Sequence, residues 1–322
     1  MPREPTRSRS GLFAPEVQLE DITTILDDTA VLHRLTLFVP AGKVTVLMGP
    51  SGVGKTTLIK HVVGLLEPDG GTVRIGGRDI WESSPEEWQE IRKGLGAMLG
   101  GHSLYSTSVF GSMTVLRNLT YSLEALGVPA GERHERAMAR LRELKLEDEF
   151  DQLPEKLPAH AIKRLALARA LVADAPLTVL DEIDVGLDRD HAAAMLDAVR
   201  DLRDRTGCTL LITTHNLELA RSVADNLAIL VNGRIVASGP PRVVLDGVET
   251  TEDFDRRFEF SDGTGPPRLE DAEAAADRRP PVRPRVGSRS GADAQMAWIA
   301  IAAVALIAAL FIAVKLLSGG VP

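Results

Sequence analysis

The sequence predicts a layered α/β domain, followed by a linker and one membrane-spanning helix. Over residues 15–248, short apolar runs alternate with helical patterns, which is typical of helices packed on a sheet. Residues 249–294 lose this alternation and become acidic, then rich in Pro, Arg and Ser, as expected of a disordered linker. The segment Met296–Val314 carries no charged side chain, which is typical of a membrane span.

The composition is that of a folded domain with a substantial core. Hydrophobic residues make up 44% of the 322 residues. The net charge of −8 argues against a general nucleic-acid-binding protein, so no nucleic acid is expected among the partners. The single cysteine, Cys208, lies in an apolar run and is expected to be a buried free thiol in a reducing compartment.

The expected strands and helices of the α/β domain alternate along the chain. Strands are expected at residues 43–48, 177–182, 209–215 and 227–233, with residues 233–239 completing a last hairpin. Helices are expected at residues 55–66, 85–94, 114–126, 131–147, 161–173, 190–206 and 216–223. Most of the helix between the first two central strands falls at about 86–170, which predicts a helical subdomain inserted into the α/β core.

The domain is expected to follow a tail at residues 1–14 and to precede the linker at 249–294, a transmembrane helix at 295–317 and a tail at 318–322. A helix made of the uncharged segment spans roughly 28 Å, close to the hydrocarbon thickness of a bilayer. The alternative is a buried helix of a soluble protein, but apolar character on all sides favours the membrane. Arginines precede the segment and only Lys315 follows it, so the domain is expected on the cytoplasmic face of the inner membrane.

The stretch GPSGVGKTT matches the pattern G-x-x-x-x-G-K-[ST] between an expected strand and an expected helix. Its glycines allow backbone N–H groups to surround phosphate oxygens, and the helix N-terminus adds its dipole. Lys55 is expected to reach the β- and γ-phosphates, and the Thr56 hydroxyl to bind Mg²⁺. A chance glycine turn would not explain the strand and helix on either side. The candidate binding residues are Gly49, Pro50, Ser51, Gly52, Val53, Gly54, Lys55, Thr56 and Thr57.

Two carboxylates, Asp181 and Glu182, end the expected strand 177–182. In a parallel sheet, the carboxyl ends of the strands face the same crevice as the phosphate loop. Asp181 is expected to hold Mg²⁺, and Glu182 to orient or deprotonate the attacking water. A solvated turn is the alternative, which the upstream phosphate loop disfavours. His215 ends the next strand and is expected to reach a γ-phosphate, although a lone histidine is more often structural.

Three segments together resemble the ATPase subunit of an ABC transporter over roughly residues 15–245. They are GPSGVGKTT, LTVLDEIDVGLD and LLITTHNLELARSVADNLAILVNGRIVASG. They correspond to the family's Walker A motif, its Walker B motif with the D-loop (Gly186, Leu187 and Asp188), and its switch histidine. The resemblance implies a P-loop ATPase fold, ATP and Mg²⁺ as cofactors, transmembrane permease subunits, and a second ATPase chain in a homodimer or heterodimer. The stretch GSMTVLRNLTYSLEALG is most similar to the Mce/Mla-type lipid-transport ATPases.

The segment before KRLALARA departs from the family pattern. ABC ATPases carry a Leu-Ser-Gly-Gly signature there, which binds the γ-phosphate of a nucleotide held by the opposite subunit. Here Pro158 replaces the serine, and Ala159 and His160 replace the glycines. Proline offers neither a hydroxyl nor an N–H to a phosphate, and the added Cβ atoms obstruct a close backbone approach. A degenerate signature with low ATPase activity is therefore expected.

Two further positions depart from the family. Gly100 aligns with the Q-loop glutamine, which senses Mg²⁺ and the transmembrane partner. The aromatic residue that stacks on adenine falls near Ile25 or Leu26, and loss of such a platform costs roughly 1–3 kcal/mol. The strength of nucleotide binding and the rate of ATP turnover therefore do not follow from the resemblance alone. Residues 101–114 are expected either to lie beside the permease docking surface or to form a solvent loop.

The resemblance implies an ATP-binding subunit that couples ATP binding and hydrolysis to a permease, with lipid as the expected cargo. The alternative is a catalytically weak nucleotide-binding switch or scaffold in a membrane complex. The intact residues Lys55, Asp181, Glu182 and His215 favour the ATPase, whereas the altered signature favours the scaffold.

Overall fold

The computed structural model describes residues 14–100, 108–184, 187 and 189–258. The predicted N-terminal tail, apart from its last residue, and the predicted linker beyond residue 258 lie outside this part of the chain, as does the whole predicted transmembrane helix. Among the helices that are described, none combines the length and apolar character needed to cross a bilayer.

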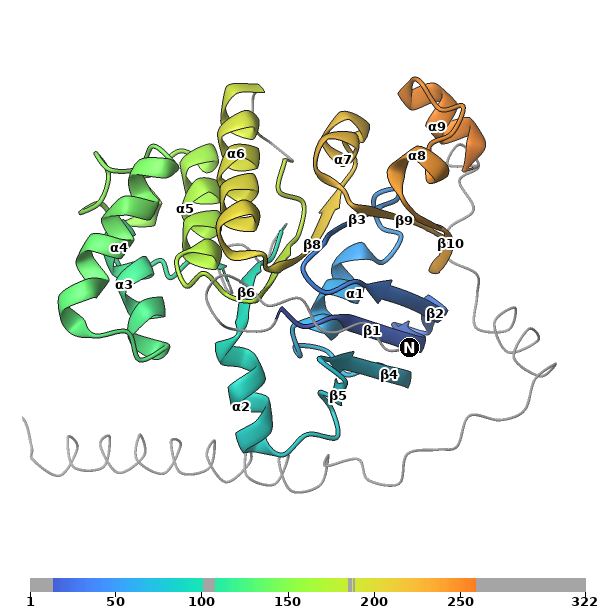
Figure 1. Ribbon diagram of the computed structural model, residues 1–322, viewed down its shortest axis with the longest axis horizontal. Coiled ribbons are helices and arrows are strands. Elements are labelled where there is room, and N and C mark those ends of the chain that lie inside the picture. Colours follow the sequence, from blue (N-terminus) through green and yellow to red (C-terminus); the bar gives the residue numbers. More distant parts are fainter. Residues whose placement is uncertain (1–13, 101–107, 185–186, 188, 259–322) are drawn as a thin grey trace, which may run out of the picture. The chain divides into compact units, whose positions relative to one another are not determined.

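The larger sheet of the described region has six strands in the order β10-β9-β3-β8-β7-β6 (Figure 1). These strands are β10 (Arg234–Gly239), β9 (Asn226–Val231), β3 (Val44–Met48), β8 (Thr209–Thr214), β7 (Leu177–Leu180) and β6 (Leu95–Met98). β10 pairs antiparallel with β9, and the other neighbours pair parallel. The carboxyl ends of β3, β7 and β8 therefore meet at one edge of the sheet.

A smaller antiparallel sheet has the order β2-β1-β4-β5. Its strands are β1 (Val17–Leu26), β2 (Thr29–Val39), β4 (Gly70–Ile75) and β5 (Arg78–Asp79). The pairing of β1 with β2 shifts register between Leu19 and Ile25, so the regular alternation of inward and outward side chains is interrupted there.

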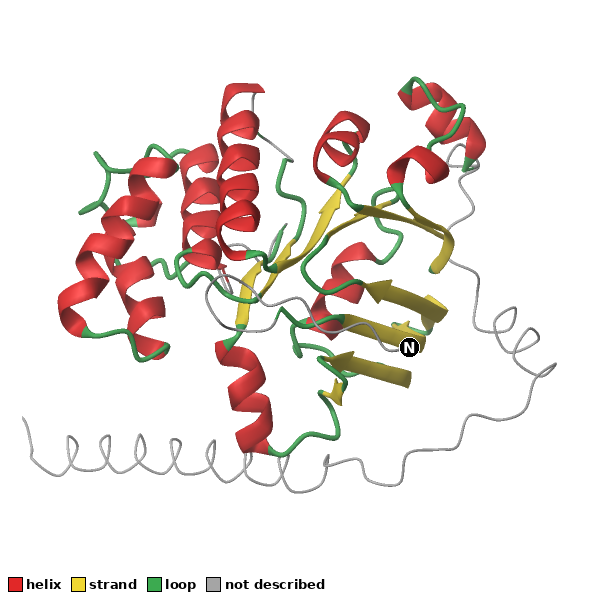
Figure 2. Ribbon diagram, viewed as in Figure 1, coloured by secondary structure: helices red, strands yellow, loops and turns green. Residues whose placement is uncertain are grey.

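Helices account for most of the remaining described residues (Figure 2). They are α1 (Lys55–Val62), α2 (Pro85–Lys93), α3 (Val115–Ala125), α4 (Ala130–Glu143), α5 (Ala159–Leu171), α6 (Arg189–Thr206), α7 (Leu217–Val223), α8 (Pro241–Val244) and α9 (Thr251–Arg257). α2 begins with a capping box, in which the Ser84 hydroxyl accepts from the Glu87 N–H and the Glu87 carboxylate accepts from the Ser84 N–H.

The two faces of the larger sheet pack against different partners. On β3, Val46 and Met48 belong to a core cluster that includes residues of α3 to α7, whereas Leu47 belongs to a cluster with α1 and the smaller sheet. Because successive side chains of a strand point to opposite faces, β3 is buried on both sides. This double burial explains the continuous apolar runs of the central strands.

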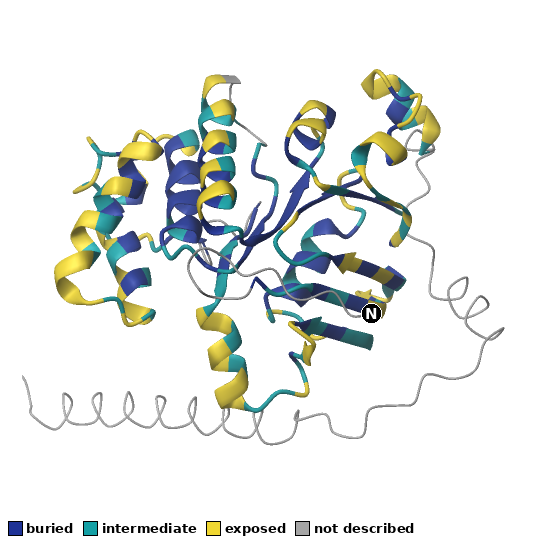
Figure 3. Ribbon diagram, viewed as in Figure 1, coloured by how far each residue is buried: buried dark blue, intermediate teal, exposed yellow. Residues whose placement is uncertain are grey.

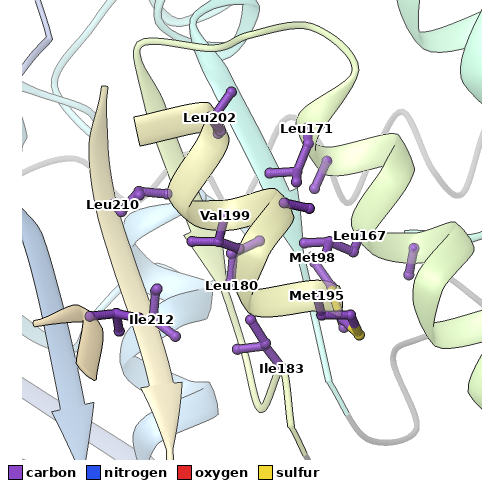
Figure 4. Packing of buried hydrophobic residues seen from close by; sticks show 14 of the residues in the cluster. Met98, Leu167, Leu171, Leu180, Ile183, Met195, Val199, Leu202, Leu210 and Ile212 are labelled. Carbon is purple, nitrogen blue, oxygen red and sulfur yellow. The ribbon is translucent and has the colours of Figure 1, made fainter. Parts of the chain in front are cut away.

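Helix α5 is buried on almost all sides (Figure 3). Leu167 and Leu171 lie close to Met195 and Val199 of α6, above Leu180 of β7 (Figure 4). Its enclosure buries even the charged residues Lys163 and Arg164 together with the apolar ones. α5 therefore links its own N-terminus rigidly to the sheet that carries the predicted site.

The predicted central strands, the hairpin and the helices are confirmed, with shifted ends. The burial of Cys208 is also confirmed, and burial raises the pKa of its thiol. The strands of the smaller sheet and β6 were not predicted. Because β6 lies in the larger sheet, the range 86–170 is not helical throughout, and the subdomain boundaries stay a prediction.

Candidate functional site

The predicted phosphate loop connects β3 to α1 through residues 49–54. Gly52 and Gly54 have φ angles of 80° and 107°, in the left-handed region that favours glycine. A Cβ atom on Gly49 would lie 2.3 Å from the carbonyl oxygen of Leu230, which leaves no room for a side chain. The backbone of this loop therefore requires glycine at the positions that the pattern specifies.

Lys55, the first residue of α1, folds back over this loop. Its side chain is buried, and its Nζ donates to the carbonyl oxygens of Gly49 at 2.9 Å and Pro50 at 2.8 Å. Burial lowers the pKa of Lys55, and the nearby carboxylate of Glu182 opposes this shift. A buried ammonium beside a glycine loop suits an anionic ligand such as a phosphate. Of the remaining loop positions, Ser51 is exposed, and Val53 and Thr57 are half-buried.

Asp181 directly follows β7 and is fully buried. Its Oδ2 accepts from the Thr56 hydroxyl at 2.8 Å and from the Gly100 N–H at 3.3 Å, and its Oδ1 accepts from the Thr213 hydroxyl at 2.6 Å. A hydroxyl and a carboxylate are the hard oxygen donors that Mg²⁺ uses together with substrate phosphates. The donor set of Thr56 and Asp181 therefore fits the cation that the sequence predicts.

Glu182 and His215 meet beyond the ends of β7 and β8. The distance between His215 Nε2 and Glu182 Oε1 is 3.6 Å, so the two form an ion pair when the histidine is protonated. His215 Nδ1 lies 3.2 Å from the Gly49 carbonyl oxygen and 3.5 Å from Lys55 Nζ. A protonated Nδ1 donates to the carbonyl, and a bare Nδ1 accepts from the ammonium. The structure thus brings Lys55, Glu182 and His215 into one group.

Four polar residues near this edge of the sheet were not predicted from the sequence, namely Thr213, Thr214, Asp184 and Lys163. Thr214 donates from its hydroxyl to Asp184 Oδ1 at 2.8 Å, and Thr213 contacts Asp181 as described above. The sequence signal for the two threonines was a pair of adjacent hydroxyls at the end of a mostly apolar strand, and that for Asp184 was a third carboxylate two residues after Glu182. Lys163 of α5 is 9% exposed, and burial lowers its pKa while Asp184 opposes that shift.

The segment expected to correspond to the signature lies at the N-terminus of α5. Pro158 is the N-cap and, with Ala159, is exposed, while His160 is half-buried. The imidazole of His160 packs on that of His191 in α6, with ring centroids 4.5 Å apart. Leu187 of the D-loop packs against the larger core cluster, whereas Gly186 and Asp188 lie outside the described residues.

Gly100 lies against the turn that carries the carboxylates. A Cβ atom there would lie 3.0 Å from the Asp181 carbonyl oxygen and 3.2 Å from Glu182 Cβ. A larger residue at this position would therefore require the neighbours to shift. The following residues, 101–107, belong to the segment expected near a permease and lie outside the described part of the chain.

The position expected to contact adenine is aliphatic. Ile25 and Leu26 end β1 and are 36% and 40% exposed. They offer apolar surface without an aromatic ring, and the Ile25 N–H donates to Asp69 Oδ2 at 2.7 Å.

Comparisons with known proteins match this chain to the ATP-binding proteins of ABC transporters. The sequence profile described as "ABC transporter" matches residues 32–184. The chain is 34% identical over 248 residues to "Probable ribonucleotide transport ATP-binding protein mkl" of Mycobacterium tuberculosis, covering 76% of this chain and 68% of that protein. It is 30% identical over 227 residues to "Methionine import ATP-binding protein MetN" of Brucella abortus, covering 70% and 60%.

Solved structures have the same fold. The ADP conformation of an ATP-binding cassette of an ABC transporter aligns with a TM-score of 0.61 and 27% identity, covering 76% of this chain and 97% of that one. A dimeric ATP-binding cassette bound to ADP and Pi aligns with a TM-score of 0.64 and 24% identity, covering 70% and 99%.

Proposed function

Because this chain belongs to the ATP-binding subunits of ABC transporters, we propose that it binds Mg²⁺-ATP at the loop of residues 49–57 and drives a transmembrane permease. The observation that carries this proposal is the connected group of Lys55, Thr56, Asp181, Glu182 and His215 at one edge of the sheet. ABC ATPases of this kind act as dimers on the cytoplasmic side of membranes.

Each residue of the group has a distinct role in the proposal. Lys55 would bind the β- and γ-phosphates, and Thr56 and Asp181 would hold Mg²⁺, which neutralises phosphate charge when bound. Glu182 orients the attacking water and accepts its proton, while His215 contacts the γ-phosphate. His215 also lies close enough to Glu182 to keep that carboxylate in place.

The test of the nucleotide site is ATP binding by the full-length chain and by Lys55→Ala. We predict that Lys55→Ala loses ATP binding, because it removes the ammonium that faces the phosphates. Lys43→Ala is the matched control, since this exposed lysine directly precedes the other end of β3. Unchanged ATP affinity in Lys55→Ala would contradict the assignment of the loop.

For the cargo, we propose a lipid, on the basis of the resemblance of residues 111–127 to the Mce/Mla-type ATPases. The printed names of the relatives differ, since one refers to ribonucleotide transport and another to methionine import. Purification of the complex from its native membrane, with identification of the copurifying chains and bound lipids, tests this proposal. A permease that copurifies with bound amino acid or nucleotide instead of lipid would overturn it.

The expected linker 249–294 overlaps α9 (Thr251–Arg257), whose Phe254 is buried, so its first residues belong to the folded domain. We propose that residues 259–294 form the linker and residues 295–317 a single membrane anchor. The support is the uncharged segment Met296–Val314 and the arginines before it. Removal of residues 295–322 should shift the chain from the membrane fraction to the soluble fraction in cells that lack the permease. Persistent membrane association of the truncated chain in those cells would contradict the anchor.

The second candidate function is a switch or scaffold that binds ATP and hydrolyses it slowly. The support for this function is the start of α5, where Pro158, Ala159 and His160 stand in place of a serine and two glycines. Pro158 and Ala159 are exposed, and His160 packs on His191. In a dimer with composite sites, either a partner chain with an intact signature or a substitute donor such as His160 would be needed for rapid turnover. ATP turnover by the purified complex distinguishes the two functions.

A further inference from the structure

Thr213 is a fully buried hydroxyl residue near the carboxyl end of β8. It follows Ile212 in β8, whose neighbour in β7 is Leu180, so Thr213 lies beside Asp181. Its side chain has no solvent exposure. Only groups of the surrounding strands and loops can therefore satisfy its hydroxyl.

The hydroxyl of Thr213 contacts both carboxylate residues of the site. It donates to Asp181 Oδ1 at 2.6 Å and accepts from the main-chain N–H of Glu182 at 2.8 Å. One hydroxyl can do both, because it has a single hydrogen to donate and lone pairs to accept. A single side chain thus ties the Asp181 carboxylate to the backbone of the next residue.

This arrangement fixes two features that the site needs. With Oδ1 of Asp181 held by Thr213, Oδ2 is directed to the Thr56 hydroxyl at 2.8 Å, on the side of the phosphate loop. The Glu182 backbone has a φ of 52°, in the left-handed region that a glutamate rarely adopts. The hydrogen bond to its N–H holds that unusual turn in place.

We propose that Thr213 is a positioning residue for the Mg²⁺-ATP site: its hydroxyl orients the Asp181 carboxylate toward the cation and fixes the turn that presents Glu182. This inference rests on the proposed function, because it assigns a role at that same site. Thr213 itself acts through Asp181 and Glu182, not through contact with the nucleotide.

A matched residue on the next strand separates this role from the packing role of any buried threonine. Thr178 of β7 is also fully buried, but its hydroxyl has no hydrogen-bond partner within the described part of the chain. Thr178→Val therefore removes a hydroxyl from the same sheet without removing a hydrogen bond. Thr213→Val makes the same change in side-chain shape but removes two hydrogen bonds, those to Asp181 Oδ1 and from the Glu182 N–H.

The experiment measures the affinity of the full-length chain for ATP, once in Mg²⁺ and once in excess EDTA. In Thr213→Val the gain in affinity that Mg²⁺ provides should fall by about 10-fold to 100-fold, the factor expected for a hydrogen bond to a charged group. The affinity in EDTA should not change, because the glycine loop and Lys55 are intact. Thr213→Ser should restore the gain, and Thr178→Val should match the wild type.

An unchanged Mg²⁺ gain in Thr213→Val would overturn the role of Thr213 and leave the proposed function standing. A wild-type chain that binds no ATP would overturn both. A fall of affinity in EDTA that equals the fall in Mg²⁺ would show a merely structural role. If Thr213→Val does not fold, Thr213→Ser and Thr213→Ala are compared, and equal Mg²⁺ gains in these two variants would overturn the role.

Discussion

His61 is a buried histidine that the fold holds in its neutral form. It has no solvent exposure, and its Nδ1 lies 2.6 Å from the carbonyl oxygen of Leu66, which can only accept. Nδ1 therefore carries the hydrogen, and Nε2 accepts from the Thr24 hydroxyl at 2.7 Å. Burial lowers the pKa of His61. The hydrogen bond between His61 and Thr24 joins α1, which begins at the phosphate loop, to β1.

The neutral state of His61 predicts that acid destabilises the protein. Below pH 6.5 the unfolded state binds a proton at this position that the folded state does not, so the free energy of unfolding falls as the pH falls, by at most about 1.4 kcal/mol per pH unit and histidine. Burial also lowers the pKa of His33, so two groups act in the same direction. The measurement is denaturant unfolding between pH 7.5 and 5.5.

His61→Gln keeps a donor and an acceptor but cannot titrate, so its stability should fall less over the same pH range. The exposed His134 on α4 provides the control, and His134→Gln should behave as the wild type. A fall in His61→Gln as large as that of the wild type would contradict the assignment to His61.

At the scale of single residues, the sequence predicts what is local and misses what depends on strand pairing. Lys55 and Thr56 were predicted because their loop is one continuous pattern, and Asp181 with Glu182 because they end a strand. Two adjacent hydroxyls mark the end of the strand in the sequence, but the role of Thr213 could not be predicted, since it depends on β8 lying beside β7 with Ile212 opposite Leu180. The contact of His160 with His191 likewise depends on how α5 and α6 pack.

At the scale of elements, Asn118 of α3 organises the loop that precedes this helix. It is fully buried, its Oδ1 accepts from the Phe110 N–H at 2.8 Å, and its Nδ2 lies 3.1 Å from the carbonyl oxygens of Phe110, Met113 and Thr114. One amide thus satisfies several backbone groups of a segment without regular structure. The loop depends on this side chain to hold its shape.

We predict that Asn118→Leu lowers the free energy of unfolding by about 1–3 kcal/mol, because the Phe110 N–H and the Met113 carbonyl oxygen lose the amide that bonds them. Arg117→Ala on the same helix is the control. Its ion pair with Glu124 is exposed, so the change should cost less than about 1 kcal/mol. Denaturant unfolding of both variants measures the difference, and equal losses would contradict the role of Asn118.

Burial, register and length explain which strands could be predicted from the sequence. The central strands β3, β7 and β8 were predicted because burial on both faces makes them continuous apolar runs. β1 and β2 were missed because register shifts break the alternation that marks a strand with one buried face. β6 was missed because it is short, contains Gly96 and lies among helical patterns.

At the scale of the whole molecule, the described chain combines a complete phosphate loop with Pro158, Ala159 and His160 at the place where the family's signature is expected. Lys55, Asp181, Glu182 and His215 form one group, whereas the start of α5 offers exposed Pro158 and no serine hydroxyl. In a dimer of composite sites, two copies of this chain would place the altered signature at both nucleotides. A homodimer is therefore expected to bind ATP and to hydrolyse it slowly.

ATP turnover by the full-length chain with its permease, before and after restoration of the signature, tests the central claim most directly. The restored variant carries Pro158→Ser, Ala159→Gly and His160→Gly, and ATP affinity is measured in parallel as the control for the phosphate loop. We predict that both chains bind ATP and that restoration raises turnover by about 10²-fold or more, because several preorganised donors to the γ-phosphate return. Rapid turnover by the unaltered homodimer that the restored signature does not increase would contradict it.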